Sequence, residues 1–341
     1  MSKPKHILVI RLSAMGDVAM TVPVLKAFSI QHPEVKITVV TRPFFKPFFR
    51  DIKNINFFDV DVKKRHKGIK GLYQLYKDTK ALGVTEVADL HNVLRSQVVR
   101  GLYKISGYKV AATNKGRADK KELTKLAPKI IKPIKSMFQR HVDTFAKLGY
   151  VIDMSKPEFA NTSNLSDKVI QLTGVKTSRW IGIAPFAQYA TKVYPQYLMQ
   201  QVIDKLVVLN PSQKIFLFGG IQEIDQLNIL KKEYDNVVVL AGKLNLSEEM
   251  DVISNLDVML SMDSGNAHIA ALLGVRVISL WGATHPFAGF LPFNQSLDDA
   301  LIPDLEKYPF LPTSVYGNKS VEGYELVMET IQVDQIINKI S

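Results

Sequence analysis

The sequence predicts an α/β protein built from two domains, each with its own parallel sheet. With 341 residues, the chain exceeds one average domain and suits two of roughly 150 residues each. In both halves, short apolar runs alternate with segments of helical spacing, a pattern typical of parallel sheets covered by helices on both faces. Between the halves, residues 153–178 are rich in Pro, Asn, Ser and Thr, which indicates a domain boundary.

The first half contains five short apolar runs, which we predict to be buried strands, and four segments with helical spacing. The strands are expected at residues 6–11, 36–41, 56–62, 86–90 and 109–112. The helices are expected at residues 17–31, 69–82, 93–104 and 138–148. Pro23 lies inside the first helix. Because proline lacks a backbone N–H, this helix should kink there or begin near Thr21.

The same alternation restarts after the boundary. Strands are expected at residues 180–184, 214–218, 237–240, 258–261 and 276–280. Helices are expected at residues 194–209, 222–234, 247–255 and 266–273, with a last amphipathic helix at 321–340. We therefore expect an N-terminal domain of residues 1–160, a C-terminal domain of residues 177–320, and a terminal segment, 321–341, whose helix packs back on the N-terminal domain. Open α/β sheets bind ligands at the carboxyl ends of their strands, so we expect a cleft there.

Charge is unevenly spread along the chain. The protein has 44 Lys and Arg against 32 Asp and Glu, for a net charge of +12. Residues 1–172 hold 32 of the basic and 14 of the acidic residues, whereas residues 173–341 are net acidic. Two stretches, 63–70 and 115–135, concentrate the basic residues. Such a half attracts nucleic acid, anionic lipid or an acidic glycan by the same Coulomb attraction, and it also fits a solvated face that keeps the protein soluble.

Several classes of protein are disfavoured by what the sequence lacks. It has no cysteine, which excludes disulfides and thiolate metal sites and fits the cytoplasm. It has no GxxxxGK[ST] motif, and the turn RLSAMGD after the first strand has a single glycine where a dinucleotide-binding GxGxxG has three. The seven histidines occur singly, and Asp59 and Asp61 share one strand face, so a metal site is a minor alternative. No apolar run of about 18 residues spans a membrane, and the N-terminus lacks the layout of a signal peptide.

The stretch VMLSMDSGNAHIAALLG in the second half predicts an anion site. An apolar strand ends at Ser261 and is followed by Asp263, Ser264 and Gly265, after which a helix of small residues begins. Gly265 lets the backbone approach a ligand closely, and the amides at a helix start carry the positive end of the helix dipole. This suits a phosphate or diphosphate, although a residue that caps the helix without a ligand fits the same pattern.

Two neighbouring motifs favour a nucleotide diphosphate as the ligand. APFAQYATKVYP follows the first strand of the same domain and places Thr191 and Lys192 at its carboxyl end. FLFGGIQEID follows the next strand, with a Gly-Gly turn and Glu223 shortly after. The lysine would bind the phosphates, and the carboxylate would accept hydrogen bonds from ribose hydroxyls.

Four segments together resemble the bacterial heptosyltransferases of glycosyltransferase family 9: RLSAMGDVAMTVPVL, DLHNVLRS, TKVYP and MDSGNAHIAALLGVRVISLWGATHP. The resemblance covers most of both domains. It implies a GT-B fold, in which two Rossmann-like parallel-sheet domains face each other across a cleft. It also implies an ADP-heptose donor, metal-independent chemistry without a cofactor, and a lipopolysaccharide inner-core acceptor at the cytoplasmic face of the inner membrane.

The resemblance also assigns roles to individual residues. Asp17 matches the family's general base, and Arg95 in DLHNVLRS falls where the family has a basic residue that faces the acidic acceptor. The donor is assigned to Thr191, Lys192, Glu223, Asp263, Ser264, Gly265 and His268. In this set, the lysine matches the family's phosphate-binding residue, and Asp263 matches the acid that holds sugar hydroxyls. One departure is Ala283-Thr284-His285-Pro286, where the family often has Pro-Thr-Asp-Pro.

These observations predict an inverting glycosyltransferase. Asp17 would take the proton from the acceptor hydroxyl as it attacks the anomeric carbon, while Lys192 and the helix amides would stabilise the departing diphosphate in place of a metal ion. The basic half would attach the protein peripherally to the inner membrane. The alternatives are a GT-B transferase that uses a UDP- or GDP-sugar, a nucleic-acid-binding protein and a catalytically inactive, sugar-sensing relative. For Asp17 alone, the alternative is a helix N-cap without a catalytic role.

Overall fold

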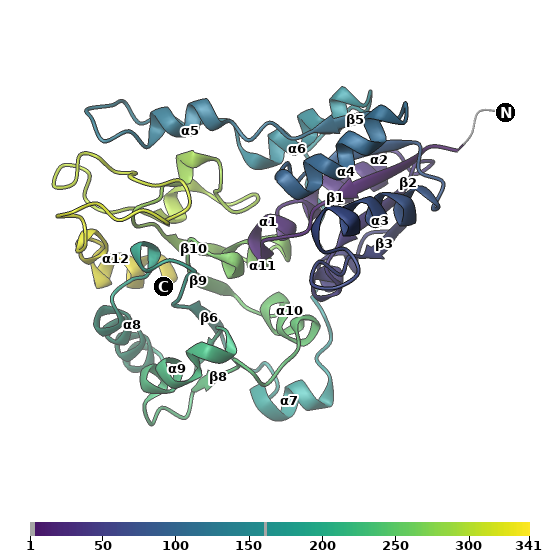
Figure 1. Ribbon diagram of the computed structural model, residues 1–341. Coiled ribbons are helices and arrows are strands. Elements are labelled where there is room, and N and C mark those ends of the chain that lie inside the picture. Colours follow the sequence, from purple (N-terminus) through teal and green to yellow (C-terminus); the bar gives the residue numbers. More distant parts are fainter. Residues whose placement is uncertain (1–3, 160–161) are drawn as a thin grey trace. The chain divides into compact units, whose positions relative to one another are not determined.

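The computed structural model describes residues 4–159 and 162–341, which form two compact units (Figure 1). The first unit consists of residues 4–116 and Met137–Glu158, and the second of Arg117–Ser136 and the chain from Phe159 onward. The break after Glu158 lies in the expected boundary, whereas Arg117–Ser136 was expected in the first domain and belongs to the second unit. None of the helices in these described residues has the length and hydropathy to cross a membrane.

The first unit is built on a five-stranded parallel sheet. Its strands are β1 (His6–Ile10), β2 (Lys36–Thr41), β3 (Ile55–Asp59), β4 (Glu86–Asp89) and β5 (Lys109–Ala112), in the order β3-β2-β1-β4-β5. All five were predicted. β1 is the central strand and every residue in it is buried, as its unbroken apolar sequence indicates.

The segment after β1 forms two helices where the sequence suggested one. These are α1 (Met15–Ala19) and α2 (Val22–Gln31), and Thr21 is the N-cap residue of the second. Pro23 lies in the first turn of α2, where its missing N–H costs no hydrogen bond. The predicted interruption is therefore confirmed. It leaves α1 as a short helix that carries Asp17 directly after the central strand.

Helices cover both faces of the first sheet. α3 (Gly68–Lys80) and α4 (Leu94–Ile105) pack on one face, where their buried side chains form a cluster with those of the strands (Figure 1). α2 and α6 (Met137–Lys147) pack together on the other, and the rings of Phe28 and Phe145 meet with 4.9 Å between centroids. Removing these apolar faces from water is the main stabilising contribution in this unit.

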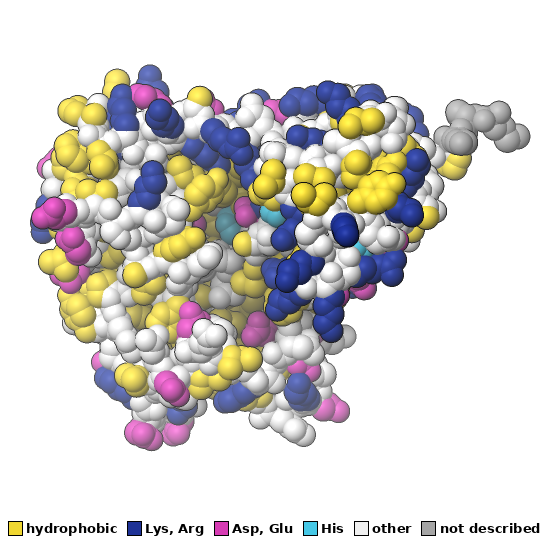
Figure 2. Space-filling view, in the orientation of Figure 1, with side chains coloured by type: hydrophobic (Ala, Val, Ile, Leu, Met, Phe, Trp, Pro, Cys, Tyr) yellow, Lys and Arg dark blue, Asp and Glu magenta, His cyan; other side chains and the backbone are white. Residues whose placement is uncertain are grey.

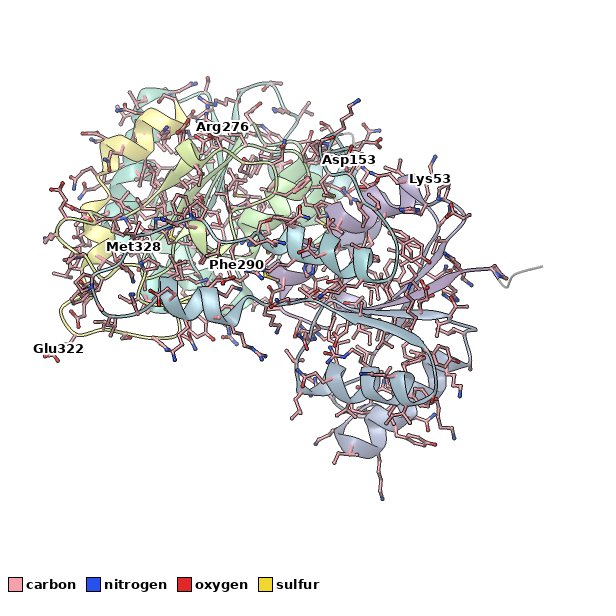
Figure 3. The ribbon with its side chains drawn as sticks, turned by 90° about the horizontal axis from the view of Figure 1, so that it is seen from above. Lys53, Asp153, Arg276, Phe290, Glu322 and Met328 are labelled. Carbon is pink, nitrogen blue, oxygen red and sulfur yellow. The ribbon has the colours of Figure 1, made fainter. Side chains whose placement is uncertain are left out.

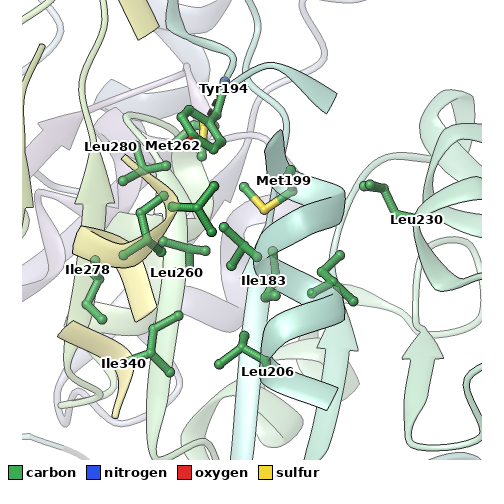
Figure 4. Packing of buried hydrophobic residues seen from close by; sticks show 14 of the residues in the cluster. Ile183, Tyr194, Met199, Leu206, Leu230, Leu260, Met262, Ile278, Leu280 and Ile340 are labelled. Carbon is green, nitrogen blue, oxygen red and sulfur yellow. Dashed lines mark hydrogen bonds between the residues drawn. The ribbon is translucent and has the colours of Figure 1, made fainter. Parts of the chain in front are cut away.

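The second unit is built on a six-stranded parallel sheet in the order β11-β10-β9-β6-β7-β8. Its strands are β6 (Trp180–Ala184), β7 (Lys214–Leu217), β8 (Val237–Val239), β9 (Val258–Met262), β10 (Val277–Leu280) and β11 (Ala300–Leu301). The helices before the last one are α5 (Arg117–Leu123), α7 (Asp167–Thr173), α8 (Gln196–Leu209), α9 (Ile224–Lys231), α10 (Leu246–Ser254) and α11 (Gly265–Leu272). Apolar side chains from the strands, α8 and α9 form the core shown in Figure 4.

The last helix differs from its prediction. α12 (Val333–Ile340) covers only the end of the expected range, and a 3₁₀ turn at Val327–Thr330 precedes it. Its side chains Ile336 and Ile340 are fully buried in the core of the second unit, with α8 and β10 as neighbours. The helix therefore packs on the second unit, because its apolar stripe completes the core of the sheet that precedes it. Packing of this segment on the first domain stays a prediction.

Residues 117–136 extend along the second unit and are fixed there by two lysines. The Lys129 ammonium donates a hydrogen bond to the carbonyl oxygen of Phe310 at 2.8 Å. The Lys120 ammonium lies 4.2 Å from the ring centroid of Phe290, which Figure 3 labels beside α5. These partners are more than 150 positions away in the chain, so no local pattern in the sequence could have indicated this packing.

Candidate active site

Asp17 is held after the carboxyl end of β1 by two contacts. Its carboxylate accepts a hydrogen bond from the backbone N–H of Ala14 at 3.4 Å, as an acidic residue in the first turn of a helix can. It also pairs with the Arg11 guanidinium at 2.5 Å, and this buried guanidinium donates to the Leu90 carbonyl oxygen at 2.7 Å. The Asp17 side chain is 36% exposed, so it is fixed in place and still open to a reactant.

The imidazole of His91 lies beside these charges and is neutral. Burial, together with the cations Arg11, Lys115 and Arg95, lowers the pKa of His91 to about 3, although the Asp17 carboxylate opposes this shift. Its Nδ1 is buried and has no hydrogen-bond partner among the described residues. Because its conjugate acid is so strong, His91 is a poor base at neutral pH, and it can act there only as a neutral hydrogen-bonding group.

Basic side chains follow three other strands of this sheet at their carboxyl ends. Arg42 follows β2, and its Nε donates to the Leu12 carbonyl oxygen at 3.2 Å while its guanidinium lies 4.7 Å from the ring centroid of Phe45. Arg95 is exposed in the first turn of α4, after β4, and Lys115 follows β5. The carboxyl edge of the first sheet therefore presents positive charge around Asp17, which suits an anionic ligand.

In the second unit, Asp263 follows β9 and is buried with two partners. The Lys192 ammonium lies 3.3 Å from its Oδ2, and the Thr284 hydroxyl donates to the same oxygen at 2.8 Å. These three side chains follow β6, β9 and β10, which are neighbours in the sheet. The structure thus brings together Lys192 and Asp263, two of the residues assigned to the donor, and adds Thr284 to them.

A loop around Gly317 fixes the 3₁₀ turn Ala190–Lys192. The Thr191 hydroxyl donates to the Gly317 carbonyl oxygen at 2.5 Å. Gly317 has a φ of +81°, and a Cβ atom at this position would lie 2.6 Å from Cγ of Lys192. Glycine is therefore required here both by the backbone and by the close approach of the lysine stem. The contact holds Thr191 next to Lys192, and donor binding by Thr191 stays a prediction.

α11 begins directly after Asp263, and no side chain among the described residues caps its first amides. Ser264 is the N-cap residue, and its hydroxyl lies 3.1 Å from the hydroxyl of Ser261. Gly265 is the first helical residue, so no Cβ screens the amides there. His268 lies one turn further and is buried. The start of this helix therefore has amides that can bind an anion.

Glu223 lies at the Gly-Gly turn, and its carboxylate is partly engaged. Its Oε2 accepts a hydrogen bond from the backbone N–H of Gly220 at 2.6 Å, which closes the turn Ile221–Glu223. A Cβ atom at Gly219 would lie 2.7 Å from the same oxygen, so glycine lets the carboxylate fold against the backbone. The structure gives Glu223 this local contact, and ribose binding by Glu223 stays a prediction.

The sequence analysis did not single out Arg11, His91 or Thr284 as site residues. Arg11 interrupts an apolar run, and a charge in a buried strand end needs a partner, which is a signal that could have pointed to the Asp17 pair. Thr284 belongs to the segment Ala283-Thr284-His285-Pro286. This segment differs from the Pro-Thr-Asp-Pro of the family at its first and third positions, but it has the same threonine. In the part of the chain that the structure describes, no three His, Asp or Glu side chains lie close enough together to hold a metal ion.

Comparison with known proteins identifies relatives over most of the chain. The model of glycosyltransferase family 9 (heptosyltransferase) matches residues 74–309. The lipopolysaccharide core heptosyltransferase OpsX of Haemophilus influenzae is 24% identical over 306 residues, which cover 87% of this chain and 84% of that protein. The lipooligosaccharide heptosyltransferase 2 of the same species is 26% identical over 302 residues, which cover 82% of this chain and 84% of that protein.

Solved structures share the fold. A family 9 glycosyl transferase from Veillonella parvula aligns with a TM-score of 0.74 and 21% identity, covering 98% of this chain and 95% of that chain. Escherichia coli heptosyltransferase WaaC with ADP aligns with a TM-score of 0.70 and 18% identity, covering 98% of each chain. The two parallel-sheet units have the fold of these GT-B enzymes, which confirms the predicted fold class. Since the family model spans more than half of the chain, the protein belongs to glycosyltransferase family 9, the heptosyltransferases.

Proposed function

We propose that this glycosyltransferase moves heptose from ADP-heptose to a sugar of the lipopolysaccharide inner core, with inversion at the anomeric carbon and without a metal ion. The names of its relatives support a lipopolysaccharide or lipooligosaccharide acceptor. The similar WaaC structures contain ADP and ADP-2-deoxy-2-fluoro heptose, which supports the donor. Because such an acceptor is an amphiphile, the proposal places the enzyme peripherally on the cytoplasmic face of the inner membrane.

The observation that carries the donor assignment is the cluster of Lys192, Asp263 and Thr284 beside the start of α11. In this proposal, Lys192 and the backbone amides at Ser264 and Gly265 bind the diphosphate. Negative charge that develops on the leaving group then meets positive charge that is already in place. Asp263, held by Thr284, accepts hydrogen bonds from the sugar hydroxyls.

Asp17 is the general base in this proposal. The acceptor oxygen forms a bond to the anomeric carbon while the bond from that carbon to the diphosphate oxygen breaks, and the hydroxyl proton passes to Asp17. Attack from the side opposite the leaving group inverts the anomeric centre. Arg11 orients the carboxylate through its 2.5 Å ion pair, and Arg42 and Arg95 would pair with acidic groups of the acceptor.

Calorimetric titration with ADP, UDP and GDP tests the donor assignment. ADP should bind in preference to the other two, and Lys192→Ala should weaken its affinity by about tenfold or more, because a charged contact to the diphosphate is lost. Lys205→Ala is the matched control, since this lysine of the same unit pairs with Asp334 on the surface. Preference for UDP or GDP would keep the fold and replace the donor, and equal ADP affinity in both variants would contradict the site.

A further inference from the structure

α4 carries apolar side chains on two opposite sides. Its residues Val99 and Tyr103 are buried in the cluster that it forms with α3 and the sheet. On the outer side, Leu94 and Ile105 are 79% and 87% exposed. At about 100° per residue, these two lie within roughly 20° of each other around the helix axis. A surface helix normally has polar residues on its outer side, so these two exposed apolar side chains, one at each end of α4, indicate an interaction surface.

α3 packs beside α4 and adds both apolar and basic side chains to the same outer face. Ile69 and Tyr73 are 82% and 53% exposed, and the exposed lysines Lys70 and Lys77 lie next to them along the helix. Figure 2 shows hydrophobic side chains surrounded by Lys and Arg over these two helices. An apolar patch ringed by cations is the pattern of a surface that lies on anionic lipid.

The charge of this face has one sign. Residues 63–80 and 94–105 contain ten Lys and Arg and a single acidic residue, Asp78. That carboxylate is already engaged, because the Arg65 guanidinium pairs with it at 2.8 Å. Arg100 also pairs with the buried Asp89 at 2.9 Å, so eight of the ten basic side chains remain for a partner. A partner that matches them must be anionic over a wide area.

We propose that the outer faces of α3 and α4 dock this protein on an anionic lipid bilayer. The apolar side chains enter the interface, and the lysines lie against lipid phosphates. A second copy of the chain is a poor occupant, because a symmetric dimer through this face would set the eight remaining basic side chains against eight others. The inference rests on the proposed function, in which the acceptor is a membrane lipid, and it adds which surface meets the membrane.

The docking face adjoins the edge of the sheet where Asp17 lies. Leu94, the first residue of α4, is followed by Arg95, whose charge contributes to the lowered pKa of His91. His91 in turn lies within electrostatic reach of Asp17. A lipid whose chains remain in the bilayer thus has its head group near the proposed base once these helices rest on the membrane.

Residues 117–136 form the other basic stretch of this protein, and they suit a bilayer less well. They expose Leu126 and Ile130, but the exposed acids Asp119 and Glu122 line the same groove as Ile130. Two of the lysines in this stretch, Lys120 and Lys129, contact other residues of the second unit and are less available to lipid phosphates. We therefore assign the docking surface to α3 and α4.

Sedimentation of the full-length protein with vesicles tests the proposal. The wild type should pellet at low salt with phosphatidylcholine vesicles that contain about 30% phosphatidylglycerol, and less as salt rises. Ile69→Gln/Ile105→Gln should lower this binding by about tenfold or more, because two apolar contacts are lost. Val208→Gln/Ile229→Gln changes two exposed apolar residues on α8 and α9 and should bind like the wild type.

Absence of wild-type binding, or equal binding by the Ile69/Ile105 variant, would overturn the docking surface. A wild-type dimer that this variant dissociates, without any vesicle binding, would assign the face to a second copy instead. A second assay measures heptose transfer to a delipidated, water-soluble acceptor. Because this reaction needs no membrane, it tests the proposed function separately from the docking surface. The variant should retain that transfer, whereas its absence in the wild type would contradict the proposed reaction and leave vesicle binding as evidence for the surface.

Discussion

Asp17 can be both a structural and a reactive residue, because the contacts that hold it also aim it. The Arg11 guanidinium is almost fully buried, and such a charge is costly to leave without a partner. The Asp17 carboxylate and the Leu90 carbonyl oxygen meet that need at its two terminal nitrogens, whereas its Nε is buried without a partner among the described residues. The hydrogen bond from Ala14 satisfies one amide at the start of α1. The N-cap residue of α1 is Ala14, so Asp17 is not the N-cap that was expected as an alternative, and it caps the helix from the third helical position. This contact does not exclude base catalysis.

Asp17→Asn separates the two roles. The asparagine oxygen can still accept the Ala14 N–H, but the amide cannot take a proton from the acceptor, so kcat should fall by about 10² to 10⁴. The KM for the donor should change little, and the loss of the ion pair should lower the melting temperature. Asp59→Asn is the control, because this exposed acid of the same unit pairs with Lys46 and should not affect turnover. Near-normal turnover of Asp17→Asn would refute the catalytic role.

At the scale of the element, ten of the eleven strands could be predicted because each is a short apolar run between polar turns. β11 was missed because its two residues are too few to form such a run. The break around Pro23 followed from the chemistry of a single residue. The predicted helix at 321–340 was wrong over its first part. Apolar residues also line irregular segments, and Gly323, with a φ of +77°, ends helical geometry there. α5 was missed because long-range contacts hold it on the second unit.

In the candidate site too, features of the local sequence could be predicted, whereas contacts between distant parts of the chain could not. The positions of Asp17, Lys192 and Asp263 could be predicted because each follows a predicted strand, and ligands bind at the carboxyl ends of such strands. Their roles stay predictions. Pairings across the sheet could not be read from local sequence, which is why Thr284 was absent from the prediction. His91 was missed for a related reason, since its low pKa arises from burial and from cations that follow other strands.

The turn Pro286–Ala288 links one element of the second unit to pH. His285 caps it, and its Nδ1 accepts the Phe287 N–H at 3.1 Å. Burial, with a smaller effect of Lys129, lowers the pKa of His285 to about 4. An unfolded histidine titrates near 6.5. Between these two values the unfolded chain binds a proton that the folded chain does not, so stability falls as the pH falls through this window and levels off below it.

His285→Asn should reduce this acid sensitivity. Asparagine can cap the same turn through its side-chain oxygen and does not titrate. From about pH 6.5 downward, the wild type should lose up to about 1.4 kcal/mol of unfolding free energy per pH unit through His285, and the variant should lose that much less. Urea unfolding of both proteins between about pH 7 and pH 5 measures the difference. Parallel stability curves over this range would show that His285 does not contribute.

At the scale of the whole molecule, the two units divide the charge less sharply than the two halves of the chain do, but the excess still lies in one of them. Because residues 117–136 belong to the second unit, the first holds 24 basic and 11 acidic residues and the second 20 and 21. The excess positive charge therefore lies in the unit that carries Asp17, α3 and α4. This distribution agrees with the proposal that the first unit binds an anionic acceptor and its membrane, while the second unit binds the donor.

The two units should also be distinguishable in unfolding, because both tryptophans, Trp180 and Trp281, are buried in the second unit. Tryptophan fluorescence then reports the second unit alone, whereas circular dichroism reports both. If the donor binds where we propose, ADP at about 100 times its Kd should raise the free energy of unfolding of the second unit, measured by fluorescence, by about 2.7 kcal/mol. The phase of the circular dichroism signal that reports the first unit should not change. A single transition that ADP shifts equally in both signals would contradict this independence.

Lys129→Met tests whether residues 117–136 are part of the second unit in solution. Residue 129 lies in the first half of the chain, but its ammonium donates to the Phe310 and Pro312 carbonyl oxygens of the second unit. Because the variant leaves both oxygens without this donor, the free energy of unfolding measured by tryptophan fluorescence should fall by about 2 to 4 kcal/mol. Lys147→Met is the control, because this exposed lysine lies on α6 of the first unit and should leave that transition in place. If Lys129→Met shifted only the dichroism phase of the first unit, residues 117–136 would belong there. The basic stretch would then add to the charge around Asp17.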